Sequence, residues 1–452
     1  MSKRSYYGVA NTARRIKKIY IGVDGVARKV RKAYVGVNGV ARPFFTGGEV
    51  KYYGSILPMS YRVYTSAGTG NASAAAIPGS YGVFAGGEIS PFKGEPNAYN
   101  AYCRSTVTAY SRNFTQIMPA ELPEPRADML AASVPNYAIF AGGYYEEIET
   151  NDSGIGGIVH SRPRFDAWAY DKSLTRTAIP DVPKITGAYG DYGSSGYAVG
   201  NIADNAVIAR ADGNTFMYTK SLTQVPLSTF NIVKDKKCKF TYAGKLAVLG
   251  PGYRSSGDIG PSQIVYALDE NFVQYRPTEG LQSLRLEYGA ASNITHAIFV
   301  GGQTYTVNKY GNYVNNYDQS YHVDVYDGAL TKVNVGIALY PCAEVAGGTL
   351  GDCAVFAGIR SNEWEDKPWG TTSGARYIMK YDSELTCSHV VGDTTASMAN
   401  PHKRGVSVCF SDIMLIAGSA VYHSDELTDG QYENYYDNYE CDYSAVDAII
   451  LD

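Results

Sequence analysis

The chain has 452 residues and a formal net charge of −4, and 45% of its residues are hydrophobic, an ordinary composition for a globular protein. It contains no run of about 18 apolar residues, which argues against a membrane-spanning helix, and its first residues lack the apolar core of a signal peptide. The seven cysteines show no CxxC or Cys/His spacing, which argues against a disulfide framework and a zinc site.

The N-terminal segment, residues 1–46, consists of three tandem 14-residue repeats that align on Tyr6, Tyr20 and Tyr34. The second and third copies read YIGVDGVARKV and YVGVNGVARPF. Asp-Gly and Asn-Gly pairs between alternating residues are typical of tight β-hairpin turns. The sequence therefore predicts an arm of small hairpins, separated by TGG at 46–48 from a second domain over residues 50–452.

The arm is strongly basic. Residues 1–45 hold 11 Lys and Arg residues against one acid, Asp24, which gives +10, whereas the remaining 29 basic and 43 acidic residues give −14. Small hairpins bury too little surface to be stable alone, so we expect them to pack on a partner, on copies of themselves or on the second domain. A nucleic-acid role or a disordered tail would also suit a basic segment, but the glycines, hairpin turns and regular alternation favour packing.

These repeats resemble the short GVDGVAR-type repeats found near the ends of virion-associated proteins of bacteriophages and prophages. The match covers residues 6–44. The resemblance implies a virion component, made in the host cytoplasm without a signal peptide, whose arm docks it to other virion proteins. The arm residues that we predict to dock are Tyr20, Arg28, Tyr34 and Arg42.

After residue 80, a short apolar strand that ends in or near glycine recurs seven times. Glycine suits the end of a buried strand because it tolerates a positive φ and a close approach of the backbone. Recurrence at this spacing is typical of a solenoid or a propeller. The copies are YGVFAGG at 81–87, YAIFAGG at 137–143, NAVIARA at 205–211, LAVLGPG at 246–252, HAIFVGG at 296–302, CAVFAGI at 353–359 and IMLIAGS at 413–419.

A second marker alternates with the first. It follows a short alternating run, so each copy is predicted to be a strand that enters a turn, in which an Asp side chain can bond the backbone two residues on. The distance from this marker to the next apolar strand is nearly constant, whereas the distance from the apolar strand to the marker varies from 10 to 35 residues. The copies are YSRNFT, YDKSLT, YTKSLT, LDENFV, YDGALT and YDSELT, which begin at Tyr110, Tyr170, Tyr218, Leu268, Tyr326 and Tyr381, and a seventh begins at Leu451.

The two markers in this order resemble the kelch-type β-propeller over roughly residues 50–452. That resemblance implies four strands per blade, an apolar second strand that ends in Gly-Gly, a third strand that ends in Tyr-Asp, and a variable loop between them. The tryptophan of the kelch fourth strand is missing, since the chain has only Trp168, Trp364 and Trp369. We therefore predict an all-β fold, a seven-bladed propeller of four-stranded blades preceded by the hairpin arm.

The last blade ends after its third strand, so its fourth strand has to come from elsewhere if no edge is to remain unpaired. The segment KYYGSILPMS at 51–60 precedes the first complete blade and has a suitable length. We predict that this segment is the outer strand of the last blade and closes the ring.

Binding is expected on the variable loops. In an antiparallel four-stranded blade, the second-to-third and fourth-to-first connections emerge on one face, so the long loops at 303–322, 360–374 and 423–443 gather there. Aromatic rings beside Asn, Asp and Glu suit stacking on sugars as well as contacts with proteins. The predicted ligand-binding residues are Tyr305, Tyr310, Tyr313, Trp364, Trp369, Tyr422, Tyr432, Tyr435 and Tyr436.

No nucleophile elbow, P-loop or HExxH motif occurs, and no local motif marks a sialidase Asp box or the Tyr/His/His/Cys set of kelch-type copper oxidases. We therefore expect a non-enzymatic virion protein that binds a host-surface glycan or protein, with no catalytic residue, metal or cofactor. Two alternatives stay open. Paired carboxylates at the axis would indicate a carbohydrate-active propeller enzyme, and the protein could instead be a purely structural part of a tail, baseplate or capsid.

Overall fold

The structure of the protein is a computed structural model, and all the regular structure that it describes is β-strand. The described residues are 6–9, 12–15, 19–23, 26–30, 32–37, 40–46, 49–59, 73–89, 102–150, 157–183, 197–210, 215–227, 235–236, 238–254, 260–286, 288–309, 313–359, 376–391, 398, 406–417 and 445–452.

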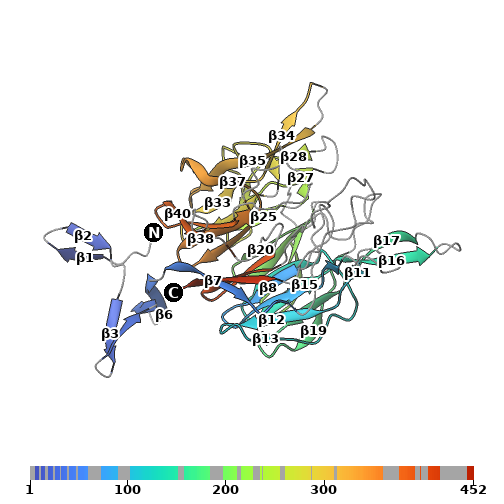
Figure 1. Ribbon diagram of the computed structural model, residues 1–452, viewed down its shortest axis with the longest axis horizontal. Helices are drawn as coiled ribbons and strands as arrows, with labels where there is room; N and C mark the ends of the chain where they lie inside the picture. The colour runs from blue at the N-terminus through green and yellow to red at the C-terminus, as the bar shows by residue number, and fades with distance from the viewer. Residues whose placement is uncertain are drawn as a thin grey trace, which may run out of the picture.

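Seven antiparallel blades of four strands form a β-propeller (Figure 1), which confirms the predicted fold class. From blade 1 to blade 7, the innermost strands are β8 (Ser73–Ile77), β14 (Leu130–Val134), β20 (Tyr197–Ile202), β25 (Lys239–Ala243), β32 (Gly289–Ser292), β37 (Ile337–Leu350) and β41 (Val406–Phe410). The second strands are β9 (Tyr81–Ala85), β15 (Tyr137–Ala141), β21 (Asn205–Arg210), β26 (Leu246–Gly250), β33 (Ala297–Val300), β38 (Cys353–Ile359) and β42 (Ile413–Ala417).

The second strands coincide with the seven apolar repeats of the sequence, and the third strands end in the second marker. In the same blade order, the third strands are β12 (Val107–Ser111), β18 (Ala167–Tyr170), β22 (Thr215–Tyr218), β29 (Tyr266–Leu268), β35 (Tyr313–Tyr326), β39 (Arg376–Tyr381) and β43 (Val446–Leu451). The outer strands are β13 (Gln116–Ile117), β19 (Arg176–Ile179), β23 (Gln224–Leu227), β30 (Gln274–Tyr275), β36 (Lys332–Val333), β40 (Cys387–Val391) and, for blade 7, β7 (Val50–Ile56).

The innermost strands contact one another around the axis and leave little room between blades. A Cβ atom on Gly200 of blade 3 would lie 2.4 Å from the ring of Phe240 in blade 4. One on Gly348 of blade 6 would lie 2.4 Å from the Sγ atom of Cys409 in blade 7. Small residues therefore dominate several of these strands, for example SAAAI in β8, LAASV in β14 and GAAS in β32.

The turns between third and outer strands share one geometry. The carboxylate of Asp171 accepts hydrogen bonds from the backbone N–H groups of Ser173 (2.8 Å) and Thr175 (2.9 Å), which confirms the predicted turn role of this position. Asp269, Asp327 and Asp382 accept the same pair of bonds. In two further turns, the hydroxyls of Ser111 and Thr219 take the place of the Asp carboxylate. Each of the six turns has a non-glycine residue in the left-handed region, namely Phe114, Leu174, Leu222, Phe272, Leu330 and Leu385, with φ between 60° and 64°.

In four blades, the tyrosine of the second marker ties the third strand to the chain that enters the same blade. Its hydroxyl donates a hydrogen bond to a backbone carbonyl in the connection before that blade, and burial raises the pKa of the phenols of Tyr110, Tyr170 and Tyr326, so they remain protonated donors. The bonds are Tyr110 to Leu57 (2.9 Å), Tyr170 to Ala120 (2.8 Å), Tyr218 to Pro180 (2.6 Å) and Tyr326 to Glu279 (3.2 Å).

The seventh blade is closed by β7, which pairs antiparallel with β43. The backbones of Glu49 and Asp452 exchange two hydrogen bonds of 2.9 and 3.0 Å, and Lys51 Nζ lies 2.7 Å from a carboxylate oxygen of Asp452. Deeper in the blade, the Ser55 hydroxyl donates a 2.7 Å hydrogen bond to the buried carboxylate of Asp447. These contacts confirm that the segment beginning near residue 50 supplies the missing outer strand.

The arm forms three separate two-stranded hairpins, as predicted, and this includes its first copy, which has Ala-Asn in place of the turn pair. The three turns lie outside the described residues. Each pair of strands is joined by two residues, and the arm leads away from the propeller near the C-terminus (Figure 1). The strands are β1 (Tyr6–Val9) with β2 (Thr12–Arg15), β3 (Ile19–Val23) with β4 (Val26–Val30), and β5 (Lys32–Val37) with β6 (Val40–Thr46).

Replacing Tyr218 tests the tyrosine contact. Tyr218 is fully buried, so Tyr218→Ala should lower the free energy of unfolding by about 3–5 kcal/mol through the cavity that it leaves. Tyr218→Phe should lower it by about 1–3 kcal/mol, because the Pro180 carbonyl then has no donor in its place. Urea denaturation measures both, and Tyr53→Phe, at an exposed ring, is the control that should change little. Equal stability of Tyr218→Phe and wild type would contradict the contact.

Deleting the closing strand tests the ring. A chain that begins at residue 60 lacks β7, so the edge of β43 is left open, and we expect aggregation or a large drop in melting temperature. A chain that begins at residue 49 keeps β7 and is the matched control, which should melt close to the full-length protein. Melting of both chains at the same temperature would show that β7 is dispensable for closure.

Candidate ligand-binding face

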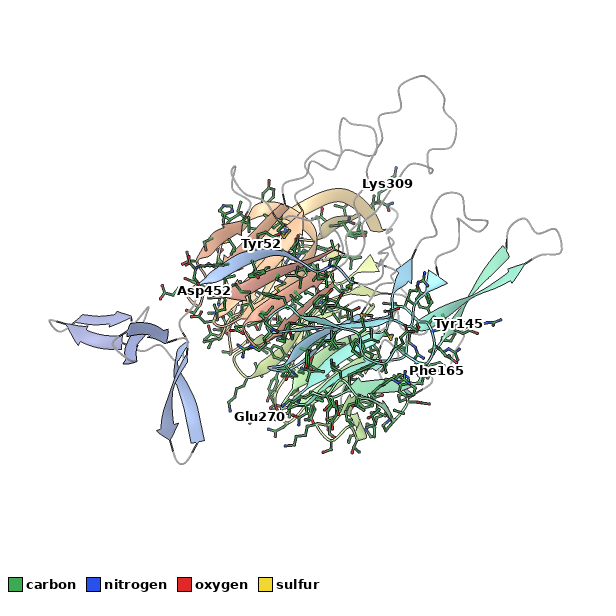
Figure 2. All side chains as sticks on the ribbon, turned by 60° about the horizontal axis from the view of Figure 1, so that its bottom comes forward. Tyr52, Tyr145, Phe165, Glu270, Lys309 and Asp452 are labelled. Carbon is green, nitrogen blue, oxygen red and sulfur yellow. The ribbon has the colours of Figure 1, made fainter. Side chains whose placement is uncertain are left out.

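The two ends of the propeller differ in what they carry. Because the strands of each blade are antiparallel, the second-to-third and fourth-to-first connections lie at one end, here called the loop face, and the short turns lie at the other, here called the turn face. Glu49 and Asp452 lie at the turn face, where β7 begins and β43 ends. Figure 2 shows Asp452 beside the arm, with Tyr145 and Lys309 on the side of the molecule away from it.

Additional strands extend the loop face. The longest hairpins described there are β16 (Tyr144–Thr150) with β17 (Gly157–Pro163) in blade 2, and β34 (Gln303–Val307) with the first half of β35 in blade 5. The segment at 303–322, interpreted above as a loop, is therefore a hairpin that lengthens the blade. Shorter elements are β10 (Glu88–Ile89) with β11 (Tyr102–Cys103), β27 (Tyr253–Arg254) with β28 (Gly260–Pro261), and two linker strands, β24 (Asp235–Lys236) and β31 (Arg285–Leu286).

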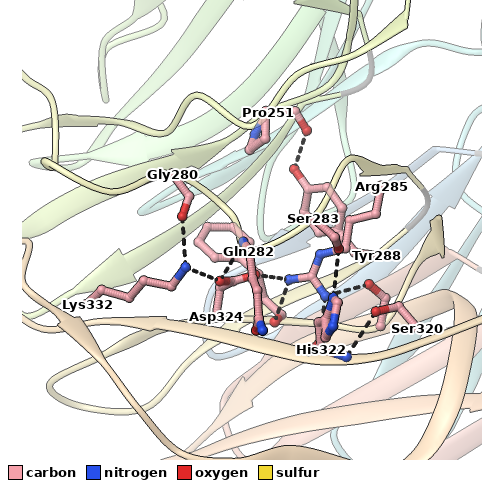
Figure 3. Close-up of polar contacts among 12 residues, drawn as sticks. Pro251, Gly280, Gln282, Ser283, Arg285, Tyr288, Ser320, His322, Asp324 and Lys332 are labelled. Carbon is pink, nitrogen blue, oxygen red and sulfur yellow. Dashed lines mark hydrogen bonds and ion pairs between the residues drawn. The ribbon is translucent and has the colours of Figure 1, made fainter. Parts of the chain in front are cut away.

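A buried arginine lies at the base of the blade 5 hairpin (Figure 3). The guanidinium of Arg285 donates hydrogen bonds to the carbonyl oxygens of Gly301 (2.8 Å) and His322 (2.6 Å), which belong to the two legs of the hairpin. It also pairs with the carboxylate of Asp324, and both side chains are fully buried. The arginine therefore joins the linker before blade 5 to both legs of the hairpin.

Asp324 is held by three donors. Its second carboxylate oxygen accepts the Gln282 N–H (3.0 Å) and lies 2.7 Å from Lys332 Nζ, which also donates to the carbonyl of Gly280 (2.9 Å; Figure 3). A buried carboxylate costs several kcal/mol in desolvation unless it is paired and hydrogen-bonded. Two cations and a backbone amide meet that requirement here.

His322 lies next to this pair and is half-buried. Its Nδ1 atom lies 2.8 Å from the hydroxyl oxygen of Ser283 (Figure 3). Burial, together with the positive charges of Arg285 and Lys332, holds the pKa of His322 below its ordinary value. The imidazole is therefore neutral at pH 7 and serves as a hydrogen-bonding group that spans the linker and the third strand.

Blade 2 repeats the arrangement with different partners. Arg126 occupies the position equivalent to Arg285, and its guanidinium is 3.5 Å from the carbonyl oxygen of Gly142 and 2.7 Å from a carboxylate oxygen of Asp166. Trp168 Nε1 donates to the same carboxylate at 2.7 Å. Burial alone would raise the pKa of Asp166, but the hydrogen bonds from Arg126 and Trp168 outweigh it and hold that pKa below its ordinary value.

Most of the predicted ligand-binding residues lie outside the described part of the chain, and the structure describes the blade 5 pair. Tyr305 is half-buried in β34, and Tyr313 begins β35, where its Cα pairs with that of Val307. The residues outside the described part are Tyr310, Trp364, Trp369, Tyr422, Tyr432, Tyr435 and Tyr436.

The arm residues predicted to dock lie in the paired strands of two hairpins. Tyr20 pairs with Lys29, and Arg28 pairs with Ile21. In the third hairpin, Tyr34 pairs with Pro43, and Arg42 pairs with Val35.

Arg126 and Arg285 are functional candidates that the sequence analysis missed. Each donates to a carbonyl 16 residues later, at the end of a second strand, so no pattern of neighbouring residues marks it. Among the described residues, no cluster of three or more His, Cys, Asp or Glu side chains could hold a metal ion. The same part of the chain contains no helix suited to crossing a membrane.

Comparison with known proteins does not identify a family. No protein-family model matches the chain, and a search among curated proteins finds no match. Among solved structures, the chain is similar to one titled "Structure of YjhT", with 12% sequence identity, a TM-score of 0.44, and coverage of 74% of this chain and 99% of that chain. Similarity at this level does not identify a function, which depends on the site itself.

A double-mutant cycle tests the Arg285–Asp324 pair. Arg285→Met alone leaves a buried carboxylate with fewer donors and should lower the free energy of unfolding by about 3–5 kcal/mol. Adding Asp324→Leu should restore part of that loss, because the unpaired charge is removed. Urea denaturation provides the values, and Arg112→Met, at an exposed ion pair with Asp412, should cost no more than about 1 kcal/mol. Additive losses in the double variant would contradict the coupling.

Proposed function

We propose that this is a non-enzymatic virion protein that attaches the particle to its host: the loop face binds a surface glycan or protein, and the arm docks the protein to other virion components. The observation that carries this proposal is the placement of the two parts at opposite ends of the propeller. The arm joins at Glu49 on the turn face, whereas the hairpins of blades 2 and 5 extend from the loop face (Figures 1 and 2). Such a molecule can hold two partners at once without steric conflict.

The charge distribution supports separate partners. The arm segment 1–45 carries +10 and the rest of the chain −14. A strongly basic segment attracts acidic surfaces and does so in a salt-dependent manner. The arm and the propeller therefore differ in the charge of the partner surfaces that they favour, and they also face in different directions.

Repetition of the hairpin supports docking to an assembly. Three copies of one recognition unit on a single chain raise the effective concentration of the second and third contacts once the first has formed. A repeated or symmetric partner surface, as in a virion, makes use of this gain. The resemblance of the repeats to those of phage and prophage proteins points in the same direction.

Two carboxylates described near the loop face, those of Asp324 and Asp166, are not placed for hydrolysis. Asp324 is enclosed by Arg285 and Lys332, and Asp166 is bonded to Arg126 and Trp168. A glycosidase needs one carboxyl group that can donate a proton and another positioned to act as a base or nucleophile. These two carboxylates are committed to ion pairs and stabilise the loop connections.

Removing the arm tests the docking half of the proposal. A chain that begins at residue 49 should remain a folded propeller and should not join particles when it replaces the full-length protein. Particle incorporation is measured on purified particles by quantitative mass spectrometry. Incorporation of the truncated chain at the full-length level would contradict docking through the arm. If the full-length protein is incorporated but is released above moderate salt, its docking would be assigned to simple charge attraction.

Replacing the loop aromatics tests the binding half. Trp364→Ala, Trp369→Ala, Tyr435→Ala and Tyr436→Ala should each weaken attachment to host cells by about 1–3 kcal/mol if these rings anchor the ligand. Melting temperatures should stay near wild type, because loop residues contribute little to the blade cores. Cell-binding isotherms of the labelled protein provide the affinities. Unchanged binding by all four folded variants would leave a purely structural role as the better interpretation.

A further inference from the structure

Blades 2 and 5 share a feature that the propeller scaffold does not require. Arg126 and Arg285 occupy equivalent, fully buried positions. The corresponding positions of blades 4 and 6 hold Asp235 and Cys342, so a blade is built without an arginine there. A buried guanidinium is costly to desolvate, and its presence in these two blades indicates a role specific to what they carry.

These two blades carry the longest hairpins described on the loop face, and in each blade the arginine donates hydrogen bonds at the base of the hairpin. Arg285 donates to Gly301 on one leg and to His322 on the other. Arg126 contacts Gly142 on one leg and Asp166 beyond the other. The residue after each arginine also approaches the hairpin closely. A Cβ on Gly143 would lie 2.5 Å from the carbonyl oxygen of Ala127, and one on Gly302 would lie 2.6 Å from that of Leu286.

The blade 2 hairpin presents a mixed aromatic and charged group at its base. The guanidinium of Arg164 lies 4.3 Å from the centre of the Tyr145 ring and pairs with the carboxylate of Glu124. The side chains of Arg164 and Glu124 are 32% and 47% exposed, and Arg162, whose Cα pairs with that of Tyr145, is exposed. Fork-shaped donors, carboxylate acceptors and a ring edge within reach of solvent are the groups that bind neighbouring hydroxyls.

The blade 5 hairpin presents a second aromatic group. Tyr305 is half-buried in β34 between Thr304 and Thr306, and Lys309 lies exposed just beyond the strand. Figure 2 shows Lys309 and Tyr145 well apart on the same side of the molecule. A half-buried aromatic ring near an exposed lysine provides a stacking surface and a hydrogen-bond donor, which suit a polyhydroxylated ligand.

The ring order separates the two hairpins. Blades 3 and 4 lie between blades 2 and 5 on one side, and blades 6, 7 and 1 lie between them on the other. The hairpins therefore stand on different sides of the axis, and one small sugar cannot touch both. A chain of several sugars can, and its two contacts reinforce each other as linked binding events.

We propose that the hairpins β16–β17 and β34–β35 form two contact points for one extended polysaccharide, through Tyr145 with Arg164 and through Tyr305, and that Arg126 and Arg285 are the positioning residues that hold the two hairpins at the required separation. This inference rests on the proposed function and specifies its ligand as a linear glycan. A protein ligand is the competing outcome of the test.

The test starts from a printed array of bacterial surface polysaccharides probed with the full-length protein, followed by oligomers of increasing length cut from the strongest binder. Affinity should rise steeply once the oligomer is long enough to reach both hairpins. Tyr145→Ala and Tyr305→Ala should each weaken binding of the long oligomer about tenfold and remove the dependence on length. Tyr53→Ala, at an exposed ring on β7, is the control and should bind as wild type.

Two results would overturn the inference while leaving host attachment intact. One is a bound polysaccharide whose affinity does not depend on length or on Tyr145 and Tyr305, which would place the glycan site elsewhere. The other is attachment to host cells with no polysaccharide bound on the array and with protease-sensitive cell receptors, which would assign a protein ligand. Loss of cell attachment altogether would instead contradict the proposed function.

The positioning role has its own readout. Arg126→Lys and Arg285→Lys keep the charge but lose the forked hydrogen bonds. Amide hydrogen exchange should then become faster in β16–β17 or in β34–β35 while the second strands of the blades stay protected, and affinity for the long oligomer should fall while that for short ones does not. Arg112→Lys is the control at an exposed pair. Equal acceleration throughout the blade, or equal loss for short and long oligomers, would indicate a general loss of stability and contradict positioning.

Discussion

Close packing of seven wedge-shaped blades around one axis is the constraint on which the rest of this structure depends. Neighbouring inner strands pack closely, and a Cβ on Gly200 would lie 2.4 Å from the ring of Phe240 on the next inner strand. Alanine, glycine and serine dominate β8, β14 and β32, whereas larger residues such as Phe84, Phe140 and Phe299 pack between blades on the second strands. The strand β7 completes the last blade, and we expect the ring to be stable only when it is closed in this way.

Closure by β7 also determines from which face the arm leaves the propeller. The strand that completes blade 7 begins at the turn face, so whatever precedes it must leave from that face. The turns there are uniform, held by Asp171 and its equivalents, and leave little freedom for variation. Length changes are therefore confined to the loop face, where strands of the blades can be extended without disturbing the axis.

The fold was predictable from the sequence because both of its markers have local physical causes. Gly-Gly after an apolar run indicates the end of a strand. The Asp of YDKSLT indicates a turn whose hydrogen bonds depend only on neighbouring residues. The proposed binding face was less predictable. Arg126 and Arg285 bond to carbonyls 16 residues away and to carboxylates about 40 residues away. Such distant pairings leave no local pattern in the sequence. A high aromatic content indicates that a loop is suited to binding, but it does not indicate which rings lie close together in the structure.

The two arginine clusters show how a repeated scaffold acquires specificity. At equivalent positions, blade 5 pairs Lys332 with Asp324, whereas blade 2 places Arg176 over the ring of Trp168, with 5.0 Å from guanidinium to ring centre. Both solutions place a cation from the outer strand against the third strand, and both accompany a buried arginine under a hairpin. Since replacing buried ion pairs by apolar residues often stabilises a protein, stability alone does not account for retaining them. Directional bonds from a planar guanidinium to two legs of a hairpin do account for it, because apolar packing tolerates small rotations that such bonds do not.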